Sequence, residues 1–186
     1  MNLPNILTLG RIIAIPVIIT LALSNSEVLR WVALMLFVLA AITDFLDGYL
    51  ARIMKLVSPL GRMLDPIADK LLVGALLVAL AWDQTLSTID LIPAIIILMR
   101  EIFISGLREY LAGQNAVVHV SKLAKYKTTL QLVALGICLA ETLISGLGTI
   151  SDILLWGAGA LTAWTGWSYW QGAQEFMRNA PEEADH

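Results

Sequence analysis

Four aspartates in the first half of the chain have the residue type and the spacing of a metal site. Asp44 and Asp47 are three residues apart, so both would lie on one face of a helix. Asp65 and Asp69, four residues apart, would share a face in the same way. Four carboxylates gathered in apolar surroundings would repel one another unless cations neutralised them. Because carboxylate oxygens suit hard ions such as Mg²⁺, Mn²⁺ or Ca²⁺, we predict a divalent-metal site.

Basic residues are expected at the same level as these acids. They are Arg11, Arg52, Arg100, Arg108, Lys122, Lys125 and Lys127. Acids that bind metal beside bases that bind anions are typical of a site that handles phosphate. A single lysine could equally be a topology signal, with its stem lying along apolar surface. Arg100 is different, because it lies inside an apolar run beside Glu101, where charge is costly.

The segments that must position these residues are strongly apolar. Hydrophobic residues make up 58% of the chain and charged residues 15%, whereas a soluble domain has about half and about a quarter. The apolar residues form runs of about twenty, the length that crosses roughly 30 Å of hydrocarbon as a helix. The predicted fold is therefore all-α, a polytopic membrane protein with six transmembrane helices. These are expected at residues 6–23, 28–52, 61–82, 91–111, 125–144 and 150–169.

The charges in the junctions predict the orientation of these helices. The junctions after the second and fourth helices carry several Lys and Arg residues, whereas 83–90 and 146–152 carry none. Loops rich in Lys and Arg face the cytoplasm. We therefore predict that both termini are cytoplasmic, and that the four aspartates lie at the cytoplasmic ends of the second and third helices.

The whole chain is expected to form one unit. We predict a single six-helix transmembrane catalytic domain over residues 1–176, followed by a polar cytoplasmic tail over 177–186. Aromatic residues near the end of the sixth helix are interpreted as a belt at the membrane interface. They are Trp164, Trp167, Tyr169 and Trp170.

The carboxylate motif resembles the signature of the CDP-alcohol phosphatidyltransferases. Its residues are Asp44-x-x-Asp47-Gly48-x-x-Ala51-Arg52, then eight residues, then Gly61-x-x-x-Asp65-x-x-x-Asp69. Every fixed position of the signature is present, and the six transmembrane helices of that family match the number predicted above. The resemblance implies a reaction in which an alcohol attacks the phosphate of a CDP-linked lipid and CMP leaves.

The resemblance also implies roles for individual residues. Two metal ions, Mg²⁺ or Mn²⁺, would be held by Asp44, Asp47, Asp65 and Asp69. Asp69 would also be the catalytic base on the attacking hydroxyl; as a metal ligand it is a weak base, so either it is loosely coordinated or the metal acidifies the alcohol. Contacts to the CDP-lipid are expected from Asn5, Thr8, Arg11, Asp47, Gly48, Ala51, Arg52, Ser58 and Gly61.

Two further stretches resemble the branch of the family whose acceptor is glycerol 3-phosphate. They are residues 4–11, and residues 100–109 followed by Lys122-x-x-Lys125-x-Lys127. Glycerol 3-phosphate is a dianion, so its pocket needs cations beyond those that serve the CDP-lipid. We expect these to be Arg100, Arg108, Lys125 and Lys127. Inositol phosphate would need the same cations and stays an alternative acceptor, whereas inositol or serine would need fewer.

Other classes of protein explain the pattern less well. An ion transporter would have acids near the middle of the membrane and broken or repeated helices, and a structural metal-binding protein gives the basic residues no role. The expected partners are CDP-diacylglycerol, glycerol 3-phosphate and membrane lipids, with no nucleic acid, and the resemblance implies a homodimer. The expected location is the inner (cytoplasmic) cell membrane, multi-pass, with the active site facing the cytoplasm.

Overall fold

The computed structural model describes residues 3–53, 59–114 and 123–179, and these residues form six helices and no strand. Only the backbone is described at helical residues 3–5, 45–53, 59–60, 62, 124–125 and 179. The predicted all-α class with six helices is confirmed. The helices are α1 (Leu3–Ala22), α2 (Glu27–Ile53), α3 (Pro59–Trp82), α4 (Leu91–Gly113), α5 (Leu123–Glu141) and α6 (Gly148–Asn179).

The sixth helix is longer than the sequence predicts. It continues past the expected end at Tyr169 to Asn179, so residues 177–179 of the predicted polar tail are helical. Gln, Ala, Glu, Met and Arg in this extension are good helix formers. Ala173 is fully buried, and Phe176 packs against the same apolar cluster between α4 and α6. A few apolar residues that pack against α4 therefore stabilise the helix through a segment whose composition is mostly polar.

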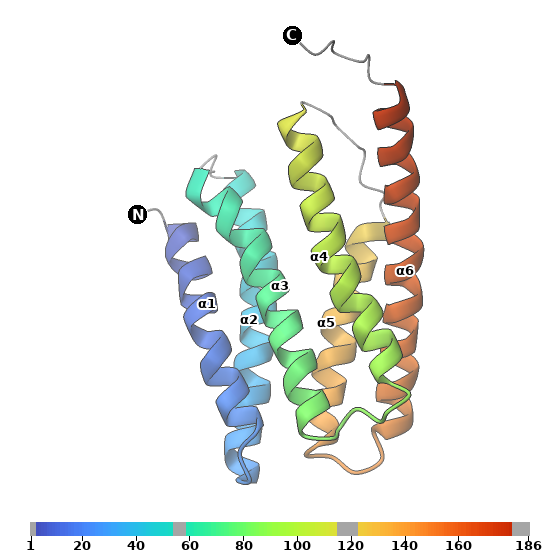
Figure 1. Ribbon diagram of the computed structural model, residues 1–186. Coiled ribbons are helices and arrows are strands. Elements are labelled where there is room, and N and C mark those ends of the chain that lie inside the picture. The colour runs from blue at the N-terminus through green and yellow to red at the C-terminus, as the bar shows by residue number, and fades with distance from the viewer. Residues whose placement is uncertain (1–2, 54–58, 115–122, 180–186) are drawn as a thin grey trace.

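The helices form two groups of three that lie side by side (Figure 1). In the first group α1 packs against α2 and α3, and in the second α6 packs against α4 and α5. Smaller contacts of α3 with α4 and α5, and of α2 with α5, join the groups. The starts of α1, α3 and α5 and the ends of α2, α4 and α6 lie at one end of the bundle, which we call the upper end (Figure 1).

The core of the bundle draws on all six helices. Its most buried large side chains are Ile18, Phe37, Leu76, Ile97, Leu135 and Leu155, one from each helix in chain order. Gly136 of α5 faces the Phe37 ring, where an added Cβ would lie 3.3 Å from Cε1. The core therefore holds the two groups of helices together, α2 and α3 with their aspartates among them.

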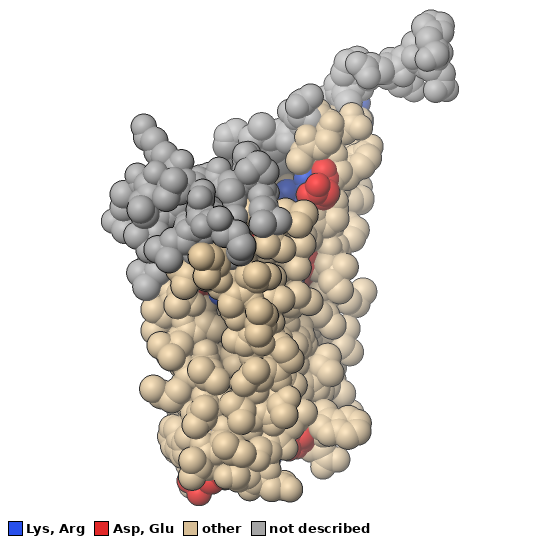
Figure 2. Space-filling model, turned by 90° about the vertical axis from the view of Figure 1, so that its left-hand side faces the viewer, with Lys and Arg blue, Asp and Glu red and all other residues tan. Residues whose placement is uncertain are grey.

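The outward faces of the helices are also apolar. Val28, Met99 and Ile153, on three different helices, are 69%, 66% and 66% exposed. Figure 2 shows a face of the bundle that carries few charged side chains between its two ends.

Within the described part of the chain, we find no helix that combines the length and the apolar character needed to cross a membrane. The prediction of six helices is thus confirmed, but its transmembrane part has no support from the individual helices.

Candidate active site

Two side chains of α1 bind carboxylates on the neighbouring helices. The Thr8 hydroxyl donates a hydrogen bond to Oδ1 of Asp65, with 2.6 Å between the oxygens. The Arg11 guanidinium donates to Oδ1 of Asp44 and forms an ion pair with it. Thr8 and Arg11 are both buried and three residues apart, so they lie on one face of α1. That face links the aspartates of α2 to those of α3.

The described aspartates of this cluster influence one another electrostatically. Asp44 interacts with Asp65, and Asp69 interacts with Asp44. All three are partly buried. The side chain of Asp47, the fourth predicted ligand, lies outside the described residues. Among the side chains that are described, no three Asp, Glu, His or Cys groups are arranged to hold a metal ion.

A second polar cluster lies between α4 and α5. Glu101 is buried, and its Oε1 accepts a hydrogen bond from the ammonium group of Lys127, which is also buried. The same oxygen accepts a hydrogen bond from Nη1 of Arg100, with 3.2 Å between the atoms. One carboxylate therefore pairs with two of the cations that the sequence assigns to the acceptor.

A third cation of this group lies against an aromatic ring. The Arg108 guanidinium is 5.8 Å from the centre of the Tyr169 ring, within the range of a cation–π interaction. Tyr169 is buried against Ile104 and Leu111, whereas Trp164 and Trp167 are 65% and 60% exposed. Tyr169 therefore does not belong to the predicted interfacial belt. From its position on α6, the Tyr169 side chain points toward α4.

The two clusters are neighbours across α3. Asp69 is within electrostatic range of Glu101 and Lys127. Lys70, the next residue, is within range of Arg100 and Arg108, and its ammonium donates to the Pro66 carbonyl at 2.9 Å. The carboxylates and the cations therefore form one continuous polar region.

For several predicted site residues the position of the side chain is not described. The side chains of Asn5, Asp47, Ala51, Arg52, Ser58 and Lys125, and the surroundings of Gly48, lie outside the described residues. Gly61 is described and buried at the start of α3. The described side chains brought together are Thr8, Arg11, Asp44, Asp65, Asp69, Arg100, Arg108 and Lys127.

Two residues of this region are not among the site residues that the sequence predicts. They are Glu101, the neighbour of Arg100, and Lys70. A glutamate inside an apolar helix must find a cation, so its position alone could have indicated a paired role. Nothing in the sequence, however, identifies Lys127 as the partner.

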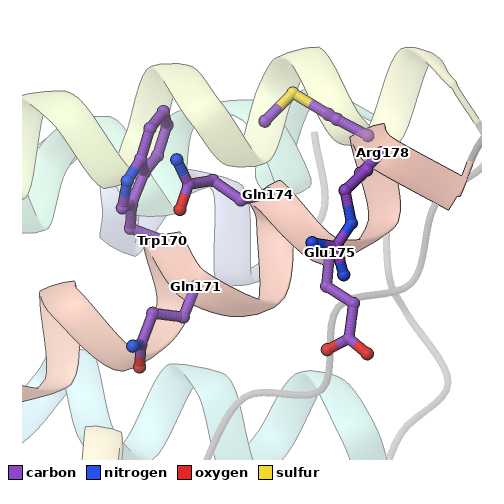
Figure 3. Close-up of a pocket in the computed structure, with 6 residues that line it drawn as sticks. Trp170, Gln171, Gln174, Glu175 and Arg178 are labelled. Carbon is purple, nitrogen blue, oxygen red and sulfur yellow. The ribbon is translucent and has the colours of Figure 1, made fainter.

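A hollow lies elsewhere, away from these clusters. It measures about 520 Å³ and runs along the last turns of α6 (Figure 3). Its lining residues are Trp170, Gln171, Gln174, Glu175, Met177 and Arg178. None of the predicted catalytic or binding residues lines it, so we do not assign the reaction to it.

Comparison with known proteins identifies the class of protein to which this fold and site correspond. Residues 1–164 match the CDP-alcohol phosphatidyltransferase family model, and the chain belongs to this family. The chain is 49% identical over 179 residues to a CDP-diacylglycerol–glycerol-3-phosphate 3-phosphatidyltransferase of Rickettsia bellii (strain RML369-C), covering 95% of this chain and 97% of the relative. A Bacillus subtilis (strain 168) protein of the same name is 36% identical over 96% of this chain and 98% of its own. The Arabidopsis thaliana protein of this name that is numbered 2 is 38% identical over 182 residues, which cover 88% of this chain and 76% of the relative.

Proposed function

We propose that this protein is a phosphatidylglycerophosphate synthase: it transfers the phosphatidyl group of CDP-diacylglycerol to sn-glycerol 3-phosphate and releases CMP. The observation that carries this proposal is the similarity to relatives named for both substrates, which extends over nearly the whole of both chains. The polar region at the upper end supports it, because it combines acids with an excess of fixed cations.

Carboxylate oxygens suit Mg²⁺ or Mn²⁺. Among the described carboxylates, Asp44 interacts electrostatically with Asp65 and with Asp69. We assign two such ions to Asp44, Asp47, Asp65 and Asp69. When bound, they supply positive charge to the diphosphate and to the departing CMP.

The protein's own groups then prepare the acceptor. The carboxylate of Asp69 takes the proton of the attacking hydroxyl, and its place between the acids and the cations suits this role. Thr8 and Arg11 hold Asp65 and Asp44 in place from α1. The proposed contacts to the CDP-lipid are those of Asn5, Thr8, Arg11, Asp47, Gly48, Ala51, Arg52, Ser58 and Gly61.

The phosphate of the acceptor belongs with the second cluster. Arg100, Arg108, Lys125 and Lys127 are the proposed ligands, and Glu101 compensates part of their charge. A dianion gains from several fixed cations, since each charge-assisted hydrogen bond is stronger than a neutral one. An uncharged acceptor such as inositol would offer these cations no charge to bind.

We further propose that the bundle lies in the inner (cytoplasmic) membrane as a multi-pass protein, with its upper end and both termini facing the cytoplasm. The support is the apolar outer surface of the helices together with the charged groups at the upper end. The acyl chains of the lipid substrate would then stay in the bilayer, while CMP and the acceptor exchange with water. A homodimer is part of the same proposal.

The test is a panel of acceptors with the purified full-length protein in detergent and lipid. With CDP-diacylglycerol and Mn²⁺ or Mg²⁺, glycerol 3-phosphate should support CMP release, whereas inositol phosphate, inositol and serine should not. Turnover with serine alone would overturn the assignment of the acceptor.

The same assay tests the metal and the base. A chelator should abolish CMP release, and Asp69→Asn should lower the rate by about 100-fold or more. Asp152→Asn, an exposed aspartate near the start of α6, is the matched control and should leave the rate unchanged. CMP release that survives both the chelator and Asp69→Asn would exclude the proposed chemistry.

A further inference from the structure

The aliphatic part of the Arg100 side chain lies against α6 at Gly166. A Cβ added to Gly166 would lie 2.8 Å from Cγ of Arg100, 3.5 Å from its Nε and 3.8 Å from its Cδ. Real Cβ atoms essentially never lie within 3.0 Å of a non-bonded atom, so the arginine stem would have to shift. The space that a side chain at position 166 would fill is therefore already taken by the arginine.

Gly166 differs in this respect from Gly157 and Gly159 of the same helix. An added Cβ at Gly157 would meet nothing within 4 Å. At Gly159 it would lie 2.7 Å from Cβ of Pro93 and 3.1 Å from its Cα, so that glycine serves the close packing of α6 on α4. Glycine inside a helix is unfavourable relative to alanine and needs a reason. At position 166 the neighbour is a charged side chain and not the backbone of the next helix.

The direction of the Arg100 side chain depends on the space that Gly166 leaves open on α6. Its guanidinium reaches Oε1 of Glu101 through Nη1. The side chain is 13% exposed, and its Nε is buried with no hydrogen-bond partner among the described residues. An arginine has five N–H donors, so this guanidinium keeps donors for an anion. They are held next to the Glu101–Lys127 pair.

We infer that Gly166 is a positioning residue for binding of the acceptor's phosphate, acting through Arg100. The inference rests on the proposed role of Arg100 as an acceptor ligand. A methyl group at position 166 would push the stem away from α6 and move the guanidinium off Glu101. Binding of glycerol 3-phosphate should then weaken, while binding of the CDP-lipid through α1, α2 and α3 should not change.

The experiment measures the KM for each substrate separately. CMP release by the full-length protein in detergent is recorded against glycerol 3-phosphate at saturating CDP-diacylglycerol, and then the reverse. Gly166→Ala should raise the KM for glycerol 3-phosphate by about tenfold, the scale of one lost charge-assisted hydrogen bond. The KM for CDP-diacylglycerol should stay the same. Gly157→Ala, on the same helix with open space around it, should change neither value.

A double variant shows whether Gly166 acts through Arg100. Arg100→Ala alone should raise the KM for glycerol 3-phosphate, and adding Gly166→Ala to it should cause no further rise, because the colliding side chain is gone. If Gly166→Ala fails to fold, the double variant should fold, since the collision is removed. A double variant that also fails would show that Gly166 serves packing only.

The outcomes separate the inference from the proposed function. If Arg100→Ala leaves the KM for glycerol 3-phosphate unchanged, the proposed acceptor site is wrong at Arg100 and the inference falls with it. If Arg100→Ala raises that KM but Gly166→Ala does not, the acceptor site stands and the inference is overturned. An equal rise from Gly166→Ala in both backgrounds would also overturn it.

Discussion

At the scale of single residues, the active site depends on side chains that hold other side chains. Thr8 and Arg11 bind the carboxylates of Asp65 and Asp44, and Glu101 binds the cations of Arg100 and Lys127. Groups that support metal or phosphate ligands fix their orientation and change affinity without contacting the ligand. These contacts therefore predict effects that differ from those of the ligands themselves.

The hydrogen bond from Thr8 should support the metal site. Thr8→Val keeps the shape of the side chain but removes the donor to Asp65, so the Mn²⁺ concentration for half-maximal activity should rise about tenfold. The rise in melting temperature on adding Mn²⁺ should shrink in parallel. Thr20→Val, on the same helix and with its exposed hydroxyl bonded to the Pro16 carbonyl, is the control and should behave like wild type. Unchanged Mn²⁺ dependence in Thr8→Val would contradict the support of the metal site by Thr8.

The ion pair of Glu101 with Lys127 should contribute to stability. Glu101→Ala leaves a buried ammonium without its carboxylate, which costs about 3–5 kcal/mol and should lower the melting temperature in detergent. The double variant Glu101→Leu/Lys127→Met should recover much of this loss, because apolar side chains replace the buried charges. Asp83→Ala is the comparison, since its partner Arg30 lies nearer solvent and such pairs contribute about 0–1 kcal/mol. Equal effects of Glu101→Ala and Asp83→Ala would contradict the buried pair.

At the scale of helices, α6 decides how the cations of α4 are presented. It packs against both α4 and α5, and small residues on it set the distance to α4. Gly159 accommodates Pro93, Gly166 accommodates Arg100, and the extension of the helix toward Asn179 adds the buried Ala173. The charged residues of α4 therefore owe their positions to a helix that carries none of the predicted ligands.

The approach of α6 to α4 should depend on Gly159. Gly159→Ala would place a methyl group 2.7 Å from Cβ of Pro93, and such overpacking costs about 1–3 kcal/mol. Gly157→Ala, two residues earlier, meets nothing and should stabilise the helix by up to about 1 kcal/mol. Melting temperatures of the two variants in detergent should therefore move in opposite directions. A stabilised Gly159→Ala would mean that α4 and α6 are free to move apart.

At the scale of the whole molecule, charge and apolar surface are separated. The described site residues bind one another between the helices, whereas outward helix faces expose large apolar side chains such as Val78 and Met99. A bundle with this surface is poorly matched to water on its sides and well matched to lipid. The proposed reaction needs the same arrangement, because one substrate is a lipid and the other is soluble.

This distribution predicts how the protein behaves during extraction. In washed membranes it should resist release by alkaline carbonate and by high salt, and it should dissolve on addition of a mild detergent. The physical reason is that apolar contact with lipid is insensitive to pH and salt, whereas charge-mediated attachment is not. Release by carbonate or salt alone would contradict placement in the bilayer.

The sequence predicted much of the site at the level of residues. The spacing of Asp44, Asp65 and Asp69 predicts one cluster; in the structure Asp44 interacts electrostatically with Asp65 and with Asp69, and a shared metal site stays a prediction. The number of helices and the family were also predicted and are confirmed. The end of α6 was not predicted correctly, because the last part of this helix has too few buried apolar residues to show a helical periodicity.

The sequence by itself determined the family, the helical class and the residues able to do the chemistry, because motif spacing and long apolar runs are local properties of the chain. Only the tertiary structure decided which polar groups pair across helices: Arg11 with Asp44, Thr8 with Asp65, and Glu101 with Lys127. It also decided that Tyr169 faces Arg108 and that Gly166 makes room for Arg100. Each of these pairs joins two helices, and the partners depend on how the helices pack and rotate against one another, which no local pattern encodes.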